Sequence, residues 1–501
     1  MLDCIIAAIT VLGCRLLSLI PCHLYDDAFI TLRIAENFAA GKGFVYNPGA
    51  PWEPVLGTTT PAYASLLSGA AALGLSLTSF CAYFSAFCDA VTAVLILRCL
   101  TGHSRLGGWL AVLALALEPE LNRNAAGGME SSFFVMIVAL ALGFGFSRWI
   151  IAASVLAALA PMVRPEGVLV LPILACWRVR SRQAAVRLFA PAVALGLVYA
   201  GLLTWYFGSP IPNSLLAKAD LYAGTGGWQR IGEILAGSFA PSWPLLAALP
   251  FVIRGCWRCL RTENPGRGFS IFPLLVTAAY LAARPMMFGW YYQPVLTAGC
   301  MWFGLGLACV LEAATPALCV GLRRTWRSVS IVSACLAILG VGAAAYHMGP
   351  NRIRSGIYEP MRAWAEQSAT PDTTILACDI GCIGYVSKAR ILDTGGLVWP
   401  EARRRTKEPE LIKQYRPDYV LVIASPARIK IMQSDSDLVR LYVPVERFNV
   451  GDDRRLIFPE EALTRSARQH WAANWRHDYI LYARRDLPIP LGDIEAVNSD
   501  D

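Results

Sequence analysis

The chain has 501 residues, of which 55% are hydrophobic and 16% are charged, and its mean hydropathy is +0.46. Soluble domains carry about 25% charged residues, so this composition excludes an ordinary soluble protein and predicts an α-helical polytopic membrane protein. The net charge of +8 does not indicate nucleic-acid binding, because the arginines gather in short clusters between apolar runs. Such clusters are typical of the cytoplasmic loops of membrane proteins.

The apolar runs predict about eleven membrane spans, since a helix needs about 20 apolar residues to cross the hydrocarbon core. In chain order they are residues 4–21, 79–100, 106–122, 131–147, 149–161, 167–177, 188–207, 236–253, 269–283, 295–312 and 329–346. We expect the first span to stay uncleaved, because no basic segment precedes it. The fifth and sixth are short and interrupted by proline and arginine, which predicts helices broken inside the protein.

The arginine clusters orient these spans. They fall in alternate connections, at residues 98–105, 148, 178–187, 254–267 and 323–327, which predicts that these connections and the N-terminus are cytoplasmic. Residues 59–77 are also apolar, but counting them as a span would reverse every later loop, so we expect an interfacial helix there. The opposite connections should converge on the outer face; they carry HLYDDAFITLR, EPELNRNAAGGMES, MVRPEG, SPIPNSLLAKAD and ARPMMFGWYYQP.

Two domains are expected. Residues 1–349 should form the transmembrane module, with a first outer loop at residues 22–78. Residues 350–501 should form an extracytoplasmic α/β domain, because the last predicted span ends on the outer side. In this domain TTILACDIGCIGYV and RPDYVLVIAS are short β-branched runs bounded by turn residues, and they alternate with helical stretches such as MRAWAEQSA.

Two adjacent carboxylates, Asp26 and Asp27, follow the first apolar run. Neighbouring side chains do not both point into one cavity, so we expect one to face a cavity and the other to cap the helix predicted from FITLRIAENFAAG. Asp27 is nearer to that helix, which slightly favours Asp26 as a general base. A carboxyl group among apolar groups and phosphate has a raised pKa, which suits a base that activates a hydroxyl. The alternative is that both are caps or solvated loop charges.

The outer segments also carry cations close to the membrane, where unpaired charges are costly. Arginine binds phosphate through two hydrogen bonds and lysine binds it as a point charge, so Arg164, Lys218 and Arg284 are candidate phosphate ligands. Glu130 and Glu166 are further candidate substrate-binding residues. Two alternatives stay open. Arg164 could instead form an internal salt bridge to Glu166 or Glu130, and Lys218 could extend to the lipid headgroups.

Tyr291 and Tyr292 belong to an aromatic group after Arg284 that is either a sugar-binding surface or part of an interfacial belt.

The motifs of several other kinds of enzyme and transporter are missing from the sequence. The sequence contains no HExxH, Walker loop or GxSxG motif, and its five histidines are scattered without metal-ligand spacing. These absences argue against zinc hydrolysis and ATP-driven transport.

The run YDDAFITLR at residues 25–33, followed by GKGFVYNPG at 41–49, resembles the first outer loop of the GT-C class of membrane glycosyltransferases. Within that class the likeness is greatest to the mycobacterial terminal arabinofuranosyltransferase and its bacterial relatives. Further short motifs follow in the order seen in those proteins: GGME at 127–130, RPEG at 164–167, PNS at 212–214 with Lys218, and DIGCIGY at 379–385.

The resemblance implies an inverting enzyme of the bacterial inner membrane, with its C-terminal domain in the periplasm. It would move a sugar from a polyprenyl-phosphate donor to a glycan, lipid or protein acceptor of the cell envelope, in contact with membrane lipids and without nucleic acid. Asp26 or Asp27 would be the base, and basic side chains would hold the lipid phosphate. Some members of the class bind a divalent cation near the loop aspartates, but two adjacent carboxylates do not establish such a site.

Two other functions compete. A transporter or flippase of lipid-linked sugars should have ionisable groups near the bilayer midplane and repeated helix bundles, whereas here the acids gather at one outer rim and no repeat is found. A glycan-binding or assembly protein with an inactive site is the second alternative.

Overall fold

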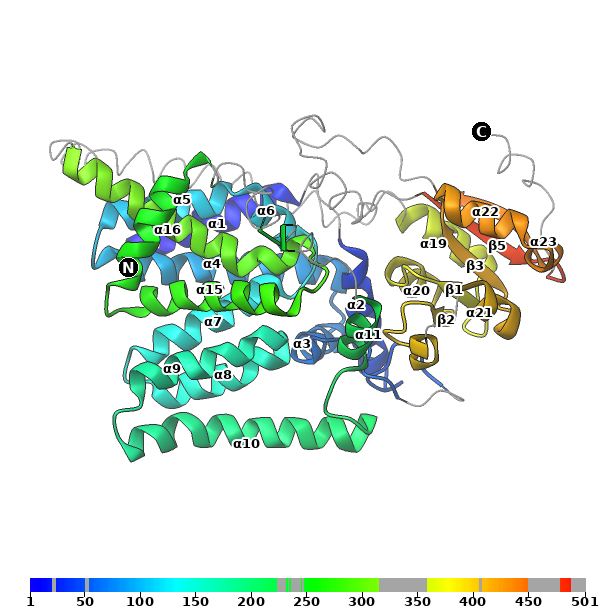
Figure 1. The fold of residues 1–501 in the computed structure, drawn as a ribbon, viewed down its shortest axis with the longest axis horizontal. Coiled ribbons are helices and arrows are strands. Elements are labelled where there is room, and N and C mark those ends of the chain that lie inside the picture. Colours follow the sequence, from blue (N-terminus) through cyan, green and yellow to red (C-terminus); the bar gives the residue numbers. More distant parts are fainter. Residues whose placement is uncertain are drawn as a thin grey trace.

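The computed structural model describes residues 1–19, 24–49, 54–222, 231–232, 234–235, 245, 247–314, 358–404, 408–448 and 478–487. The first part is helical and the C-terminal part contains a small sheet (Figure 1). The elements of the first part are α1 (Leu2–Ser18), α2 (Asp26–Ala39), α3 (Pro61–Ala72), α4 (Leu77–Thr101), α5 (Arg105–Leu117), α6 (Pro119–Ala126), α7 (Ser131–Gly145), α8 (Ile150–Val163), η1 (Pro165–Leu169), α9 (Val170–Arg178), α10 (Arg182–Phe207), α11 (Asn213–Tyr222), α14 (Leu249–Leu260), α15 (Pro265–Ala283), η3 (Gly289–Tyr292) and α16 (Gln293–Ala314).

Local capping explains where several helices begin. The Ser104 hydroxyl accepts a hydrogen bond from the Gly107 amide at the start of α5, and Ser181 does the same for Ala184 in α10. Asn264 caps α15, whose first residue is a proline. A side-chain oxygen at this position satisfies one of the amides that a helix leaves without an internal partner.

Four helices in the described ranges are long and apolar enough to cross a membrane: Leu77–Thr101, Arg182–Phe207, Pro265–Ala283 and Gly289–Ala313. A fifth span is formed if α6 and α7, which meet at a bend of 109°, are counted as one. The chain is thus a multi-pass membrane protein, but the predicted number of about eleven spans is not confirmed. The predicted span 329–346 and most of 236–253 lie outside the described residues.

Two predicted irregularities are present. The segment predicted as broken consists of α8, the 3-10 turn η1 and α9, and Arg164 and Pro165 lie at the break. Proline cannot donate an amide hydrogen bond, which helps to end α8 there. Residues 59–77 contain α3 and the first residue of α4. Helix α3 has 12 residues, is too short to cross the membrane, and packs on α2.

The helical bundle has two distinct ends (Figure 1). The turns α4–α5, α7–α8, α9–α10 and α14–α15 lie at one end, and they carry arginines such as Arg105, Arg148 and Arg261. We call this the arginine end. Helices α2, α3 and α11 lie at the other end, beside the sheet domain.

The C-terminal part is a small α/β domain. Its elements are α19 (Tyr358–Ser368), β1 (Thr374–Ala377), α20 (Gly381–Ser387), β2 (Arg390–Asp393), η4 (Pro400–Arg404), α21 (Glu408–Tyr415), β3 (Tyr419–Ile423), α22 (Pro426–Ser434), α23 (Ser436–Leu441), β4 (Tyr442–Phe448) and β5 (Tyr479–Arg484). The sheet has the order β2-β1-β3-β5-β4. Strand β1 is parallel to β2 and β3, whereas β5 is antiparallel to β3 and β4.

One detail of this domain differs from the sequence reading. In TTILACDIGCIGYV only Thr374–Ala377 is a strand, and GCIGYV lies in the helix α20. The reason is tertiary, because α20 packs against α2 of the membrane module. Cys378 and Cys382 flank the intervening turn, and both are free thiols.

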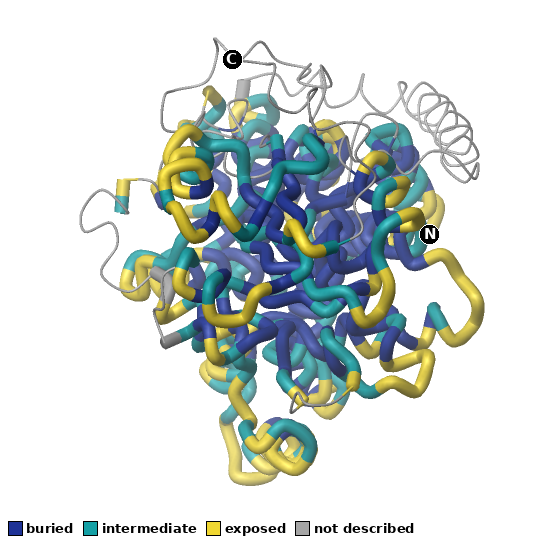
Figure 2. Tube along the Cα trace, turned by 90° about the vertical axis from the view of Figure 1, so that its right-hand side faces the viewer, coloured by how far each residue is buried: buried dark blue, intermediate teal, exposed yellow. Residues whose placement is uncertain are grey.

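The hydrophobic core continues from the bundle into the sheet domain. Phe29 of α2 stacks on Tyr358 of α19 and contacts Tyr385 of α20, with ring centroids 5.4 and 5.3 Å apart. Ile375 and Ile383 belong to the same buried cluster as the bundle helices. Viewed from the side of the sheet domain, the buried segments form one continuous centre with exposed segments around it (Figure 2).

Candidate active site

The five segments that the sequence placed on the outer face meet at the end of the bundle opposite the arginine end. Tyr25 shows how closely they pack: its hydroxyl donates to Asn124 Oδ1 at 3.0 Å and its amide donates to the Gly127 carbonyl at 2.9 Å. Its ring lies 4.9 Å from that of Trp290. The residue that precedes the two aspartates is therefore fixed by two of the other outer segments.

Asp26 does not cap its own helix. Tyr25 is the N-cap residue of α2, and no side chain caps that end. Instead the Asp26 carboxylate accepts hydrogen bonds from the backbone amides of Gly381 and Cys382, at 2.7 and 2.6 Å, where α20 begins. Burial and the nearby Asp379 charge raise the pKa of Asp26 to about 8, and the two amides act in the opposite direction.

Both carboxylates are partly buried, and Asp27 differs from Asp26 in its partner. Its side chain is 33% exposed, and its Oδ2 atom lies 3.9 Å from Lys218 Nζ. Partial burial raises the pKa of Asp27, because it removes water from the charged form. The positive charge of Lys218 lowers this pKa, and the negative charge of Asp379 raises it. The expectation that Asp27 would cap α2 is wrong, and the geometry reverses the slight preference for Asp26 as the base, because both Asp26 oxygens are already engaged.

Lys218 is held in place by contacts of α11 with the sheet domain. The Asn213 side chain donates to the carbonyls of Gly396 and Leu397, at 2.8 and 2.7 Å. Asp220, at the other end of α11, forms a salt bridge of 2.8 Å with Arg403. These contacts bind α11 at both ends and place the Lys218 ammonium beside Asp27.

Arg164 forms the internal salt bridges that were the alternative to phosphate binding. Its Nη1 atom donates to Glu130 at 2.7 Å, and its Nη2 atom donates to Glu166 at 3.0 Å. The guanidinium carbon lies 4.7 Å from the centroid of the Tyr291 ring, and the Tyr280 hydroxyl donates to Glu166. The Arg164 side chain is only 6% exposed. Two carboxylates therefore already satisfy its charge.

Arg284 and the aromatic group after it have separate environments. Arg284 is exposed and ends α15 in a left-handed conformation with φ of 49°. Tyr291 is partly buried, whereas Tyr292 is buried in the core. Trp290 is also buried and stacks on Phe288 at 4.9 Å. These rings mainly fix the segment within the protein, whereas Arg284, which precedes them in the chain, is exposed.

Several residues at this end were not found from the sequence. Arg33 of α2 donates to the carbonyls of Gly384 and Ala389, each at 2.6 Å, and the Tyr46 hydroxyl donates to Ile380 at 2.6 Å. The one available signal was an arginine within the apolar stretch FITLRIA, since a charge in such a position needs partners.

No cluster of metal ligands is found in the described ranges at this end. Among those residues, no group of three or more histidine, cysteine, aspartate or glutamate side chains is arranged to hold a metal, and both oxygens of Asp26 accept amide hydrogen bonds.

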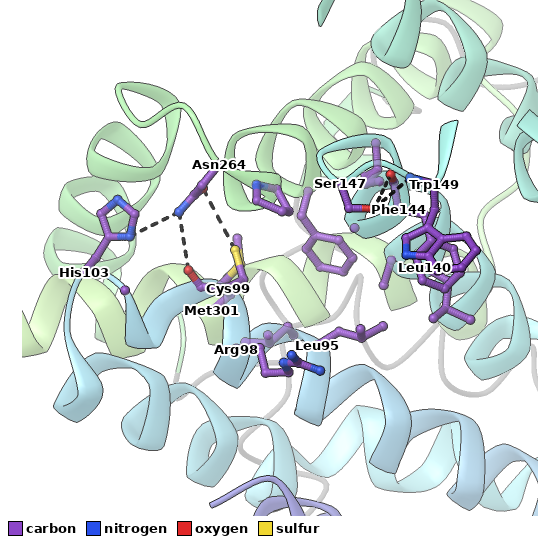
Figure 3. Close-up of a pocket in the computed structure, with 17 residues that line it drawn as sticks. Leu95, Arg98, Cys99, His103, Leu140, Phe144, Ser147, Trp149, Asn264 and Met301 are labelled. Atoms are coloured by element: carbon purple, nitrogen blue, oxygen red, sulfur yellow. Dashed lines mark hydrogen bonds between the residues drawn. The ribbon is translucent and has the colours of Figure 1, made fainter. Parts of the chain in front are cut away.

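A cavity of about 540 Å³ lies elsewhere, among α4, α7, α15 and α16 at the arginine end (Figure 3). Its walls are mainly apolar, and at one side Asn264 bonds to His103 Nδ1 at 3.1 Å. Because Asp27 is at the opposite end of the bundle, this cavity is not part of the candidate site.

Comparison with known proteins supplies the fold. ArnT from Cupriavidus metallidurans, solved bound to undecaprenyl phosphate, is similar with a TM-score of 0.55 and 13% identity, over 95% of this chain and 97% of that one. The apo form of ArnT gives a TM-score of 0.55 and 14% identity, over 93% and 95% of the two chains. The chain has the fold of ArnT.

Sequence comparison adds one match. Residues 345–482 match a family model described as a domain of unknown function, DUF8728. This range contains most of the sheet domain, including α20. No curated protein matches the chain significantly.

Proposed function

We propose that the chain is a membrane glycosyltransferase of the GT-C class, which transfers a sugar from a polyprenyl-phosphate donor to an acceptor hydroxyl. ArnT is a glycosyltransferase of this class, and the shared fold supports a transferase that uses a lipid-linked donor. The observation that carries the proposal is the pairing of the partly exposed Asp27 carboxylate with the Lys218 ammonium, 3.9 Å away. A base and a cation side by side are what transfer from a phosphate leaving group requires.

In the proposed reaction Asp27 takes the proton of the acceptor hydroxyl. The acceptor oxygen forms a bond to the anomeric carbon while the bond between that carbon and the phosphate oxygen breaks. The bonding electrons leave with the polyprenyl phosphate, and the anomeric centre is inverted because the attack is a single displacement. Lys218 and the exposed Arg284 stabilise the charge that develops on the departing phosphate.

Lys218 has two roles in this scheme. Without donor it lowers the pKa of Asp27. When the donor phosphate competes for the ammonium, Asp27 loses part of this stabilisation, and its affinity for a proton rises. Donor binding would therefore strengthen the base at the moment when it is needed. Arg164 is not a phosphate ligand in this proposal, because Glu130 and Glu166 already neutralise it.

We place the protein in the bacterial inner membrane, with the N-terminus in the cytoplasm and residues 350–501 in the periplasm. The separation of the arginine end from the end with Asp27 supports this orientation. Residues 1–349 would then bind the lipid-linked donor within the membrane, and the acceptor, a glycan, lipid or protein of the cell envelope, would approach from the periplasm.

A flippase of lipid-linked sugars is the competing function. Charged groups inside the bundle would favour it, and Arg15 and Asp89 do form a buried ion pair of 2.6 Å between α1 and α4. However, Arg15 also donates to Asn122 and to the carbonyls of Leu115 and Ala116. This network resembles a structural contact rather than a site through which a substrate passes.

The test is a transfer assay in sealed vesicles that contain the purified protein. Polyprenyl-phosphate pentose and hexose donors are supplied with cell-envelope acceptor, and both free polyprenyl phosphate and glycosylated acceptor are measured. We expect the two products in equal amounts from one of the donors. Movement of intact donor across the bilayer without either product would instead identify a flippase. Mass spectrometry of envelope glycans from cells with and without the gene identifies the sugar.

A further inference from the structure

We propose that α20 of the sheet domain and Asp379, which precedes it, are positioning elements of the active site: they hold Asp26 so that Asp27 faces Lys218. This inference rests on the proposed function, since it assigns Asp27 the role of base. It goes further by making the C-terminal domain a part of the catalytic site rather than only a holder of the acceptor.

Helix α2 binds α20 at both ends. Asp26 accepts from the amides of Gly381 and Cys382, and Arg33 donates to the carbonyls of Gly384 and Ala389. The Asp26 carboxylate thus meets the first amides of α20, whereas the Arg33 guanidinium binds a carbonyl in the middle of α20 and one just after its end. Asp26 and Arg33 are seven residues apart, so both lie on one face of α2, about 10.5 Å apart along its axis.

Two glycines allow this contact. A Cβ atom at position 381 would overlap the backbone carbonyl of Asp26, and one at position 384 would overlap the Tyr46 hydroxyl. Gly381 and Gly384 are three residues apart and lie on the same face of α20. The helix can therefore approach α2 closely only because this face lacks side chains.

The contact of Asp26 with α20 also sets the direction of Asp27. Successive residues of a helix are rotated by about 100°, so when Asp26 faces α20 its neighbour points elsewhere. Asp27 faces α11, where Lys218 lies 3.9 Å away. Fixing Asp26 therefore fixes Asp27 as well.

Asp379 adds a charge to this arrangement. The Tyr479 hydroxyl of β5 donates to its Oδ2 atom at 2.6 Å. Its negative charge raises the pKa of both Asp26 and Asp27. Besides the adjacent Asp26, the charged groups that act on Asp27 are Lys218 on α11 and Asp379 in the sheet domain. A change at Asp379 therefore alters the base from outside the membrane module.

The first experiment compares Gly381→Ala with Gly69→Ala in the transfer assay. Gly69 is a matched control, because it is also a helical glycine, in α3, which packs on α2. A Cβ atom at this position would meet no atom within 4 Å. We expect Gly381→Ala to lower kcat by about 100-fold, since a small displacement of a catalytic group costs that much, with the donor KM nearly unchanged. Gly69→Ala should behave as wild type. Full kcat in Gly381→Ala overturns the proposal.

The second experiment changes only a charge. Asp379→Asn removes the negative charge that raises the pKa of Asp27, so the acid limb of the kcat/KM profile should move to lower pH. If Asp379 has a purely structural role, the variant should lose activity without moving this limb. That result would reject the proposal that the Asp379 charge tunes the pKa of Asp27. Asp379→Asn keeps the shape of the side chain, so this variant still tests the proposal if Gly381→Ala does not fold.

A third measurement does not depend on activity. Hydrogen exchange at the amides of Gly381 and Cys382 should be slow in the wild type and faster in Asp26→Ala. Fast exchange in the wild type rejects the contact itself. Slow exchange in a chain that transfers no sugar rejects the proposed function and leaves the contact intact, so the two failures are distinguishable.

Discussion

Asp26 and Cys382 are 356 positions apart in the chain, yet the amide of Cys382 donates a hydrogen bond of 2.6 Å to the Asp26 carboxylate. This contact separates the roles of two adjacent, chemically identical side chains. Asp26 joins the membrane module to the sheet domain, whereas the Asp27 carboxylate is 33% exposed and lies beside Lys218. Changes at the two positions should therefore have different effects on activity and stability.

Replacing the two aspartates separately should give different losses. Asp27→Asn removes the proposed base and should lower kcat by about 10²–10⁴-fold, the usual contribution of general base catalysis. Asp26→Asn keeps one acceptor oxygen for the α20 amides and should cost less. Both are measured as initial rates of sugar transfer at saturating donor. Equal activity of Asp27→Asn and wild type would reject Asp27 as the base.

The two candidate phosphate ligands should be separable by their pH profiles. Lys218→Ala and Arg284→Ala should both raise the KM for the polyprenyl-phosphate donor. Only Lys218→Ala should also move the acid limb of kcat/KM, and toward higher pH, because Lys218 lowers the pKa of Asp27. Arg284 is not among the charged groups that shift this pKa in the described part of the chain. An unchanged donor KM in both variants would remove these cations from the site.

The stability of the folded protein should fall as the pH rises, through Asp26. Its pKa is raised from 3.8 to about 8 in the folded state. A group that binds its proton more tightly when folded stabilises the fold at low pH, and this contribution is lost as the pH rises from its unfolded pKa through its folded pKa. Asp26→Asn cannot titrate, so the wild-type Tm should fall relative to that of the variant between about pH 4 and pH 8. Parallel Tm curves for the two proteins in detergent would contradict this prediction.

Arg164→Met should destabilise the protein, because it leaves Glu130 and Glu166 in their places without the guanidinium that pairs with them. Breaking a buried ion pair by removing one partner costs about 3–5 kcal/mol. The matched control is Arg362→Met, which removes an exposed arginine that also pairs with two glutamates and should cost at most about 1 kcal/mol. Chemical denaturation in detergent compares them. A stable Arg164→Met protein that loses only donor affinity would make Arg164 a phosphate ligand after all.

The sequence by itself determined the membrane class, the segments that gather opposite the arginine end, and most of the residues of the candidate site. These features are encoded locally. Each of these signals acts within a short stretch of chain, so it can be recognised from the sequence alone. The signals are the hydrophobic runs, the arginine clusters and the proline after Arg164. The same local rules predicted strand β1, strand β3 and helix α19.

Only the tertiary structure decided which partner each aspartate has, that Arg164 is already paired, and that GCIGYV forms a helix. Each of these depends on partners far away in the sequence: Gly381 lies 355 positions from Asp26, and Glu130 lies 34 positions from Arg164. No local pattern encodes such contacts, because the energy of a buried charge or a close helix approach depends on which groups the completed fold brings against it. The physical reason is that desolvation and pairing act through space, whereas helix propensity and hydropathy act along the chain.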